Sequence, residues 1–380
     1  MNDYLIRTYP NRNITFVSGE GVYLTADIGR KYLDFGSNYG VNIFGYSHPR
    51  ITKELEKQLQ QLTSLHGSFG NKIRDQAAEN LVKICGGKIH SVFFSNSGAE
   101  AIEAALKFAA YARGKKKFIA VKNSFHGKTL GALSATGQEK YRLPFLPLLW
   151  DFTFVPLNDI SALEQAVDEL TAGIIIEPVQ GEGGIVIPSM EFMKTVAEIC
   201  RQNKILLITD EIQTGCGRTG TFLAAEQFGL EADIVCLGKG LAGGIPVGAT
   251  LVSADIAVGI PLHLHTSTFG GNPLAGAGIL AVLAEFNNTD LFDHIRETGQ
   301  YFLSELSRLK HPEIVEARGL GLMLALELNV NATPYLKKLQ ENGIIAIPAG
   351  SNILRFLPPF LITKKEIERL MAVLHKLFNN

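Results

Sequence analysis

Short continuous runs of apolar residues recur along the middle of the chain, separated by stretches with helical periodicity. Runs typical of strands buried on both faces occupy 117–121, 171–177, 205–209, 233–237 and 247–252. Helical spacing is found at 49–65, 73–85 and 99–112, and a helix-like spacer precedes the run at 233–237. The alternation of the two patterns predicts βαβ units and therefore a mostly parallel sheet.

The two ends of the chain have different patterns. Residues 15–46 alternate apolar and polar positions around glycine-containing turns, which is typical of a small antiparallel meander. Near the C-terminus, helical stretches and short strands follow each other in an α+β order. We therefore predict an α/β protein with a meander at 1–46 that joins the smaller domain, a large domain at 47–274, and a smaller α+β domain at 275–380.

Composition narrows the class of protein. Hydrophobic residues make up 46% and charged residues 19%, which indicates a globular chain with a large core. A net charge of −1 argues against a nucleic-acid partner or an anionic membrane surface. With neither a signal-peptide pattern nor a long apolar run, we expect a cytoplasmic protein. The 4 cysteines have no metal-type spacing, so we expect reduced, buried thiols and no metal site.

Two strands end in residues that a buried strand would not choose. The run at 205–209 leads into Asp210, and the run at 233–237 leads into Lys239 between two glycines. Ligands of open α/β sheets bind outside the carboxyl ends of the strands, so we expect an acid and an amine at the same edge. This pair suits pyridoxal 5′-phosphate (PLP): the lysine would bind the aldehyde and the aspartate would keep the pyridine nitrogen protonated.

The strength of the aspartate effect supports this interpretation. A carboxylate about 3 Å from a pyridinium is worth roughly 5 kcal/mol at an effective dielectric near 20, or roughly four pKa units. The alternative is that Asp210 caps a helix and Lys239 is a surface lysine in a turn. Either residue alone favours that alternative, whereas both together, each ending a buried strand, favour the cofactor.

Other strand ends carry candidate binding residues. Ser97, Gly98 and Ala99 begin a strong helix and could hold a phosphate through a hydroxyl and free N–H groups, although an ordinary N-cap has the same sequence. Phe125 could stack on a planar cofactor or simply belong to the core. Thr268 lies in a polar, glycine-rich turn and could donate to a phosphate.

The run at 171–177 ends in Glu177, followed by Pro178 and the glycine-rich stretch 181–184. That stretch indicates a dinucleotide loop only weakly, because the helix and the later acid of such a fold are missing. A charge at the strand end instead favours a site residue at Glu177.

Six motifs in order make the chain resemble a class III aminotransferase of PLP fold type I over nearly its whole length. They are Asn96-Ser-Gly-Ala-Glu100, Phe125-His-Gly-Lys-Thr129, Glu177-Pro-Val-Gln-Gly-Glu-Gly-Gly184, Asp210-Glu-Ile-Gln-Thr-Gly215, Gly238-Lys-Gly240 and Ser267-Thr-Phe-Gly-Gly-Asn-Pro-Leu274. Within the family, the chain is most similar to the group that acts on N-acetylornithine in arginine biosynthesis. Segment 348–359 resembles that group in particular.

The resemblance implies a role for each matching residue. Lys239 would carry the cofactor and move the substrate proton, Asp210 would pair with the ring nitrogen, and Gln213 with the ring oxygen. The whole cofactor set comprises Ser97, Gly98, Ala99, Phe125, Asp210, Glu211, Gln213, Lys239 and, from the other subunit of a homodimer, Thr268.

The implied substrate-binding residues include an arginine and an acid that would let one site accept two kinds of substrate. Arg355 is similar to an arginine that binds the α-carboxylate of glutamate, and Glu177 to the acid that neutralises it while an ω-amino substrate is bound. The whole set comprises Lys128, Glu177, Ser267, Arg355, Tyr9 and Tyr39.

Lys128 departs from the family pattern, because acetylornithine and ornithine enzymes usually have arginine at this position. The planar guanidinium of arginine binds a carboxylate better than the ammonium of lysine does. Putrescine-type aminotransferases share the lysine. We predict transfer of the terminal amino group of N-acetylornithine, or a close ω-amino analogue, to 2-oxoglutarate, with putrescine or ornithine as the runner-up donor. An aminomutase and a PLP-binding protein without turnover are the alternatives from other classes.

Overall fold

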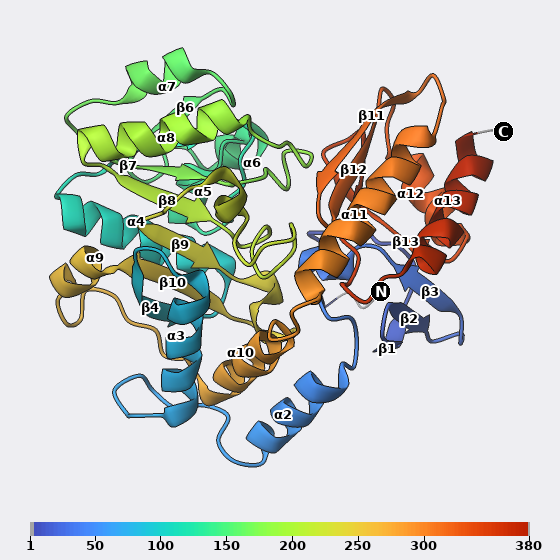
Figure 1. Ribbon diagram of the computed structural model, residues 1–380, viewed down its shortest axis with the longest axis horizontal. Helices are drawn as coiled ribbons and strands as arrows, with labels where there is room; N and C mark the ends of the chain where they lie inside the picture. The colour runs from blue at the N-terminus through green and yellow to red at the C-terminus, as the bar shows by residue number, and fades with distance from the viewer. Residues whose placement is uncertain (1–3, 379–380) are drawn as a thin grey trace.

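The computed structural model describes residues 4–378 and has a larger and a smaller part (Figure 1). The larger part contains a seven-stranded sheet in the order β4-β10-β9-β8-β7-β5-β6. Its strands are β4 (Ile89–Ser95), β5 (Lys117–Val121), β6 (Asp151–Val155), β7 (Thr171–Ile176), β8 (Leu206–Asp210), β9 (Ile234–Leu237) and β10 (Gly248–Ser253). Neighbours from β6 to β9 pair in parallel, and β10 pairs antiparallel with β4 and β9, so the predicted mostly parallel sheet is confirmed.

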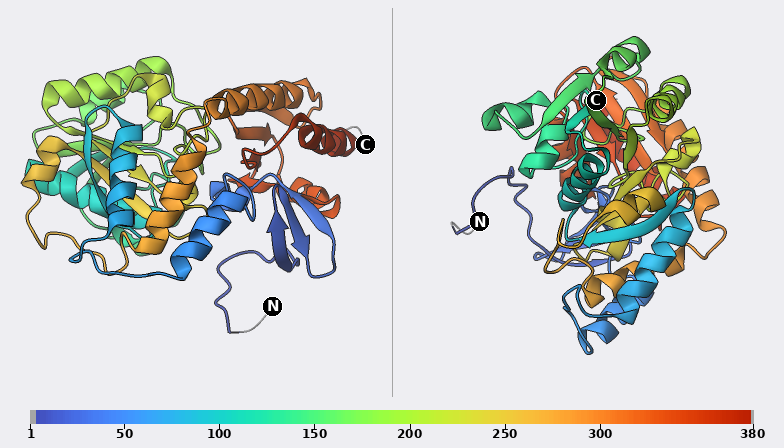
Figure 2. Two further views of the ribbon diagram at one scale, coloured as in Figure 1. Left: turned by 60° about the horizontal axis from the view of Figure 1, so that its bottom comes forward. Right: turned by 90° about the vertical axis from the view of Figure 1, so that its left-hand side faces the viewer.

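Both faces of this sheet are buried, which explains the continuous apolar runs. On β8, Leu206 and Ile208 belong to one hydrophobic cluster and Leu207 to another on the opposite face. Helices pack on both sides (Figures 1 and 2). They are α3 (Lys72–Cys85), α4 (Gly98–Arg113), α5 (Leu130–Ala135), α6 (Glu139–Arg142), α7 (Ile160–Ala166), α8 (Met190–Asn203), α9 (Ala254–Gly259) and α10 (Pro273–Glu285).

The smaller part combines both ends of the chain. Strands β1 (Phe16–Glu20), β2 (Tyr23–Ala26) and β3 (Lys31–Asp34) form the predicted antiparallel meander, and β13 (Ile344–Ile345) pairs in parallel with β3. A second sheet has the order β11-β12-β15-β14. Its elements and the accompanying helices are β11 (Ile314–Leu320), β12 (Met323–Leu328), β14 (Ile347–Ala349), β15 (Ile353–Phe356), α11 (Leu291–Arg308), α12 (Thr333–Glu341) and α13 (Lys364–Phe378). The domain boundaries at 46 and 274 stay a prediction.

Several elements differ from the sequence expectations. Helix α2 (Pro49–Leu59) ends earlier than 65, and strands β6 and β11 were not predicted. The spacer before β9 is a glycine-rich loop with only the 3₁₀ helix η2 (Ala224–Phe228). Glycine is required in this loop, because a Cβ on Gly217 would lie 2.7 Å from the ring of Phe286.

A one-turn element, α1 (Ser37–Gly40), follows β3 and is left-handed. Ser37, Asn38 and Tyr39 have φ values of 46°, 51° and 58°. Such a conformation costs L-residues roughly 1–2 kcal/mol each. Within the described residues, no helix is long and apolar enough to cross a bilayer.

Candidate active site

The acid and the amine predicted from the strand ends meet at one edge of the central sheet. Asp210 is the last residue of β8, and Lys239 begins the 3₁₀ turn η3 (Lys239–Ala242) directly after the neighbouring strand β9. Burial lowers the pKa of Lys239, and the Asp210 carboxylate opposes this shift. The nearby guanidinium of Arg355 lowers the pKa of the amine further. The amine is therefore more readily deprotonated, as a nucleophile or a base must be.

Asp210 is held by a residue that the sequence analysis did not assign. Its Oδ2 lies 2.7 Å from Nδ1 of His126, and its Oδ1 accepts a hydrogen bond of 3.0 Å from the Ile212 backbone N–H. Both side chains are buried. Among the described residues, Nε2 of His126 has no hydrogen-bond partner. The available signal was the position of histidine directly after Phe125 in a motif that follows a buried strand.

The N-terminus of α4 lies at the same edge. Ser97 is the N-cap, and its hydroxyl accepts a hydrogen bond of 3.2 Å from the Glu100 N–H. A Cβ on Gly98 would lie 2.8 Å from Ile212, and one on Gly238 would lie 3.4 Å from the Cα of Gly98. Glycine thus allows the helix end, with its free N–H groups, to approach the segments that carry Asp210 and Lys239. Such an end is a ready anion site.

An aromatic pair lies beside this centre. The ring of Phe125 meets the ring of Tyr141 edge-on, with centroids 5.7 Å apart. The exposed Lys128 places its Nζ 4.5 Å from the centre of the Tyr141 ring, and Lys140 approaches the same ring at 4.8 Å. Lys128 therefore lies close to Phe125, as a substrate contact would require, and Tyr141 connects the two.

Arg355 is fully buried and has a different carboxylate partner from the predicted one. Its Nη2 donates to Oε1 of Glu182 at 2.6 Å and to the Pro348 carbonyl at 2.9 Å. Its Nη1 donates to Oε1 of Gln213 at 3.3 Å, and the ring of Tyr39 lies 5.3 Å from the guanidinium carbon. Gln213, predicted to meet the cofactor oxygen, thus also contacts the arginine.

Glu177 does not pair with Arg355 in this structure, and its hydrogen bonds go to the backbone instead. Its oxygens accept hydrogen bonds from the N–H groups of Phe125 at 2.9 Å and Gly181 at 3.1 Å. Burial raises the pKa of Glu177 to about 7, although His126 and these backbone bonds oppose the shift. Glu177 therefore fixes the loops that carry Phe125 and Glu182. The sequence signal for Glu182 was a second acid within the glycine run 181–184.

Glu211 also differs from its predicted cofactor role. Its carboxylate accepts hydrogen bonds from the Thr214 hydroxyl and from the backbone N–H groups of Ala224, at 3.1 Å, and Ala225, at 2.7 Å. These bonds hold the loop before η2. Glu211 thus braces the loop behind Asp210.

Three further candidates have no hydrogen bond to Lys239, Asp210 or Arg355 among the described residues. Tyr9 is 85% exposed, and Thr268 lies exposed in the loop before α10. The Ser267 hydroxyl accepts hydrogen bonds from Nδ2 of Asn96 at 3.2 Å and from the Gly270 N–H at 2.9 Å, so this loop is attached to the end of β4.

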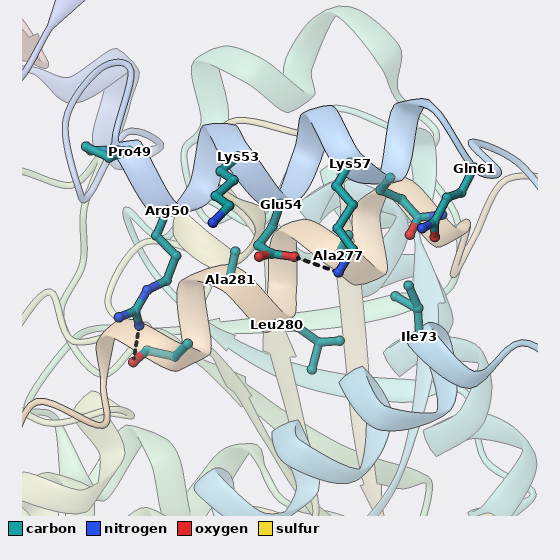
Figure 3. Close-up of a pocket in the computed structure, with 12 residues that line it drawn as sticks. Pro49, Arg50, Lys53, Glu54, Lys57, Gln61, Ile73, Ala277, Leu280 and Ala281 are labelled. Carbon is teal, nitrogen blue, oxygen red and sulfur yellow. Dashed lines mark hydrogen bonds and ion pairs between the residues drawn. The ribbon is translucent and has the colours of Figure 1, made fainter.

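A groove of about 660 Å³ lies elsewhere, between α2 and α10 (Figure 3). Lys53 and Lys57 project from α2 beside Glu54, and Arg50 donates to the Ala284 carbonyl at 3.1 Å. None of the candidate site residues lines it.

The residues at the sheet edge fit PLP. The cofactor needs an amine for its aldehyde, a carboxylate for its ring nitrogen, a stacking ring and an anion site. Lys239, Asp210 with its histidine, Phe125 and the α4 N-terminus provide these groups. The fixed orientation of Asp210 and the lowered pKa of Lys239 are the two structural observations that support the fit.

Comparison with known proteins agrees with this chemistry. The family model for aminotransferase class-III matches residues 5–378. An acetylornithine aminotransferase of Aquifex aeolicus is 42% identical over 381 residues, covering 98% of this chain and 99% of the relative. A [LysW]-aminoadipate semialdehyde/glutamate semialdehyde transaminase of Sulfolobus acidocaldarius is 40% identical, covering 98% of this chain and 96% of the relative.

Solved structures show the same fold over nearly the whole chain. An ornithine aminotransferase from Toxoplasma gondii superposes with a TM-score of 0.94 at 34% identity, covering 99% of this chain and 92% of the other. An amine transaminase from an uncultivated Pseudomonas species, in a PLP-bound form, gives 0.93 at 27% identity, covering 100% and 98%. The predicted fold type and cofactor are confirmed.

Proposed function

This chain belongs to the class III aminotransferases, which depend on PLP, and on that premise we propose that its amino donor is N-acetylornithine or a close ω-amino analogue. The terminal amino group goes to 2-oxoglutarate, giving the semialdehyde of the donor and glutamate. The names of the full-length relatives support this donor and a place in arginine biosynthesis. The observation that carries the proposal is the buried Arg355 paired with a partly exposed carboxylate.

The cofactor, when bound, supplies an electron-withdrawing ring that stabilises negative charge on the reacting carbon of the substrate. Lys239 would hold it, with Ser97, Gly98 and Ala99 at its phosphate and Phe125 on its ring. The Lys239 amine would also take the proton from the substrate carbon and return one.

Asp210 would keep the ring nitrogen protonated. The 2.7 Å bond from His126 orients the carboxylate for this role, because its other oxygen is held by the backbone. Neither side chain has room to turn away, since both are buried.

Arg355 and Glu182 would let one site accept two kinds of substrate. Arg355 is completely buried, whereas the Glu182 side chain is 23% exposed, so Glu182 is the partner that can move away. With Glu182 in place the arginine is neutralised, which suits an ω-amino end without a carboxylate. With Glu182 withdrawn, the planar guanidinium can bind the α-carboxylate of glutamate or 2-oxoglutarate in a bidentate manner.

A second copy of the chain would complete the site. Leu262 is 90% exposed and Phe269 58% exposed, on either side of Thr268. A second chain that covers this loop would remove both side chains from water. We therefore place Thr268, and with it Ser267, at the cofactor phosphate of the other subunit of a homodimer.

The test is a panel of amino donors assayed against 2-oxoglutarate. N-acetylornithine should give the highest kcat/KM, with glutamate formed in equal amount to the semialdehyde. Preference for putrescine or ornithine would move the assignment to the runner-up donors. A protein that binds PLP without consuming 2-oxoglutarate would instead be an aminomutase or a binding protein.

A further inference from the structure

The left-handed turn α1 is unusual because three of its residues carry side chains. Gly40 N–H donates to the Gly36 carbonyl at 3.1 Å and Val41 N–H to the Ser37 carbonyl at 2.8 Å, so residues 37–40 form a hydrogen-bonded left-handed turn. Glycine adopts this conformation without strain and asparagine tolerates it better than most residues, but Ser37 and especially an aromatic residue such as Tyr39 are strained in it. Surrounding contacts must therefore hold the turn.

Asp34 provides those contacts. It is buried, its Oδ1 accepts a hydrogen bond of 2.8 Å from the Gly36 N–H, and its Oδ2 accepts one of 3.1 Å from the Ser37 N–H. The hydroxyl of Tyr46 donates to the same Oδ2 at 2.6 Å. Two free N–H groups at the start of the turn are thus satisfied by one carboxylate, which Tyr46 orients.

Tyr46 is itself fixed in place. Its backbone exchanges hydrogen bonds with Gly21, at 2.8 and 2.9 Å. A Cβ on Gly19 would lie 2.6 Å from the Tyr46 ring, so the ring packs directly on that strand. The β1–β2 hairpin therefore anchors the tyrosine that orients Asp34.

The turn carries the ring that covers Arg355. Tyr39 is 43% exposed, while the guanidinium beneath it is fully buried. When Glu182 moves away, the Pro348 carbonyl and Gln213 still accept hydrogen bonds from the arginine, and the Tyr39 ring covers it. A cavity of about 360 Å³ borders Asn38, Tyr39 and Tyr46, so the ring has space to leave the arginine if the turn loosens.

We propose that Asp34 and Tyr46 are positioning residues that hold the left-handed turn, and that the turn sets the affinity of the site for the α-carboxylate by keeping Tyr39 on Arg355. The inference rests on the proposed role of Arg355 in binding that carboxylate. It predicts that loosening the turn weakens dicarboxylate binding and leaves the ω-amine half-reaction nearly unchanged.

The test compares Asp34→Asn with the unaltered holoenzyme. Asparagine presents an NH₂ group where Oδ2 accepts two bonds, so the clamp is broken without a change in size. The dissociation constant of glutarate, an unreactive dicarboxylate, should rise about tenfold, as should KM for 2-oxoglutarate. The rate of the half-reaction with an ω-amine at saturation should stay within about twofold.

A matched second substitution separates positioning from general damage. Adding Asn38→Gly to Asp34→Asn should recover much of the glutarate affinity, because glycine forms the turn without the clamp. If Asp34→Asn does not fold, Tyr46→Phe removes one bond to the carboxylate and should raise the glutarate dissociation constant about threefold. An unchanged glutarate affinity in every folded variant would overturn the proposal, as would a loss that Asn38→Gly does not relieve.

The variant Arg355→Gln distinguishes this inference from the proposed function. If it leaves glutarate binding intact, the role of Arg355 is wrong and both ideas fail. If it abolishes glutarate binding while Asp34→Asn and Tyr46→Phe do not weaken it, only the positioning role fails.

Discussion

Replacing Glu182 by glutamine tests the two-substrate site most directly. The substitution keeps the size of the side chain and removes the negative charge that lies 2.6 Å from Arg355. An amide oxygen can still accept from Nη2, so the arginine keeps a partner and stays oriented. What changes is how readily an incoming carboxylate displaces that partner.

The magnitude follows from the environment of the pair. Two unit charges about 4 Å apart interact by roughly 4 kcal/mol at an effective dielectric near 20, which is an upper bound here. The Glu182 side chain is 23% exposed, so solvent screens part of this attraction. The difference between a charged and a neutral hydrogen bond, about 1–2 kcal/mol, is the better measure. Glutamate should therefore gain about five- to thirtyfold in kcat/KM relative to an ω-amine.

Single-turnover measurement of each half-reaction gives this ratio. The cofactor absorbance reports the reaction with glutamate and with N-acetylornithine separately, without the second substrate. Glu177→Gln is the matched control, because among the described residues the Glu177 side chain accepts hydrogen bonds from the Phe125 and Gly181 N–H groups and not from Arg355. The proposed movement of Glu182 would be refuted if Glu182→Gln left the ratio of glutamate to ω-amine reactivity unchanged. It would also be refuted if Glu177→Gln changed this ratio by the same factor.

Four further predictions follow from other parts of the site. Lys239→Ala should lose the yellow colour of the holoenzyme and all transamination, and normal turnover would refute its assignment. If each active site is built from both subunits, mixing Lys239→Ala chains with Thr268→Ala chains should restore activity in up to about a quarter of the sites. If activity does not return after subunit exchange has been verified, sites built from two subunits are excluded. If Lys128 binds the donor carboxylate, Lys128→Met should lower kcat/KM for N-acetylornithine about ten- to a hundredfold, and Lys128→Arg should preserve it. If Lys128→Met changes neither half-reaction, the residue does not contact the substrate. Burial raises the pKa of Glu177 from 4.5 to about 7, so between these pH values the folded chain keeps a proton that the unfolded chain has lost. The free energy of unfolding should therefore fall as pH rises from 4.5 to about 7, by at most roughly 3 kcal/mol from this group. Unfolding curves of Glu177→Gln should show a smaller fall over this pH range, and an equal fall would contradict the raised pKa.

The sequence by itself determined most of the central sheet, all but β6, and the residues that meet at its edge. Apolar runs predict buried strands because both faces of the sheet are covered, and this pattern is local to each strand. Asp210 and Lys239 could be assigned because parallel neighbours end at the same edge. The helix start at Ser97 was readable for the same reason, since capping depends on a few adjacent residues.

Only the tertiary structure decided which carboxylate meets Arg355. Glu177 and Glu182 lie in one short motif, and their roles depend on how the chain turns between them. That path passes close to a distant segment, because a Cβ on Gly181 would lie 2.2 Å from Oε1 of Gln213. Arg355 itself arrives on β15, which reaches the site only through the packing of the smaller part. No local pattern contains this information.

The roles of His126, Glu211 and Tyr39 also could not be predicted from local sequence. Each is decided by a partner far along the chain: Asp210 for His126, the backbone at 224–225 for Glu211, and Arg355 for Tyr39. Tyr39 further depends on three consecutive left-handed residues that local preferences disfavour. Hydrophobic periodicity and capping are properties of neighbouring residues, whereas a side chain's hydrogen-bond partner across the fold exists only after the elements have packed.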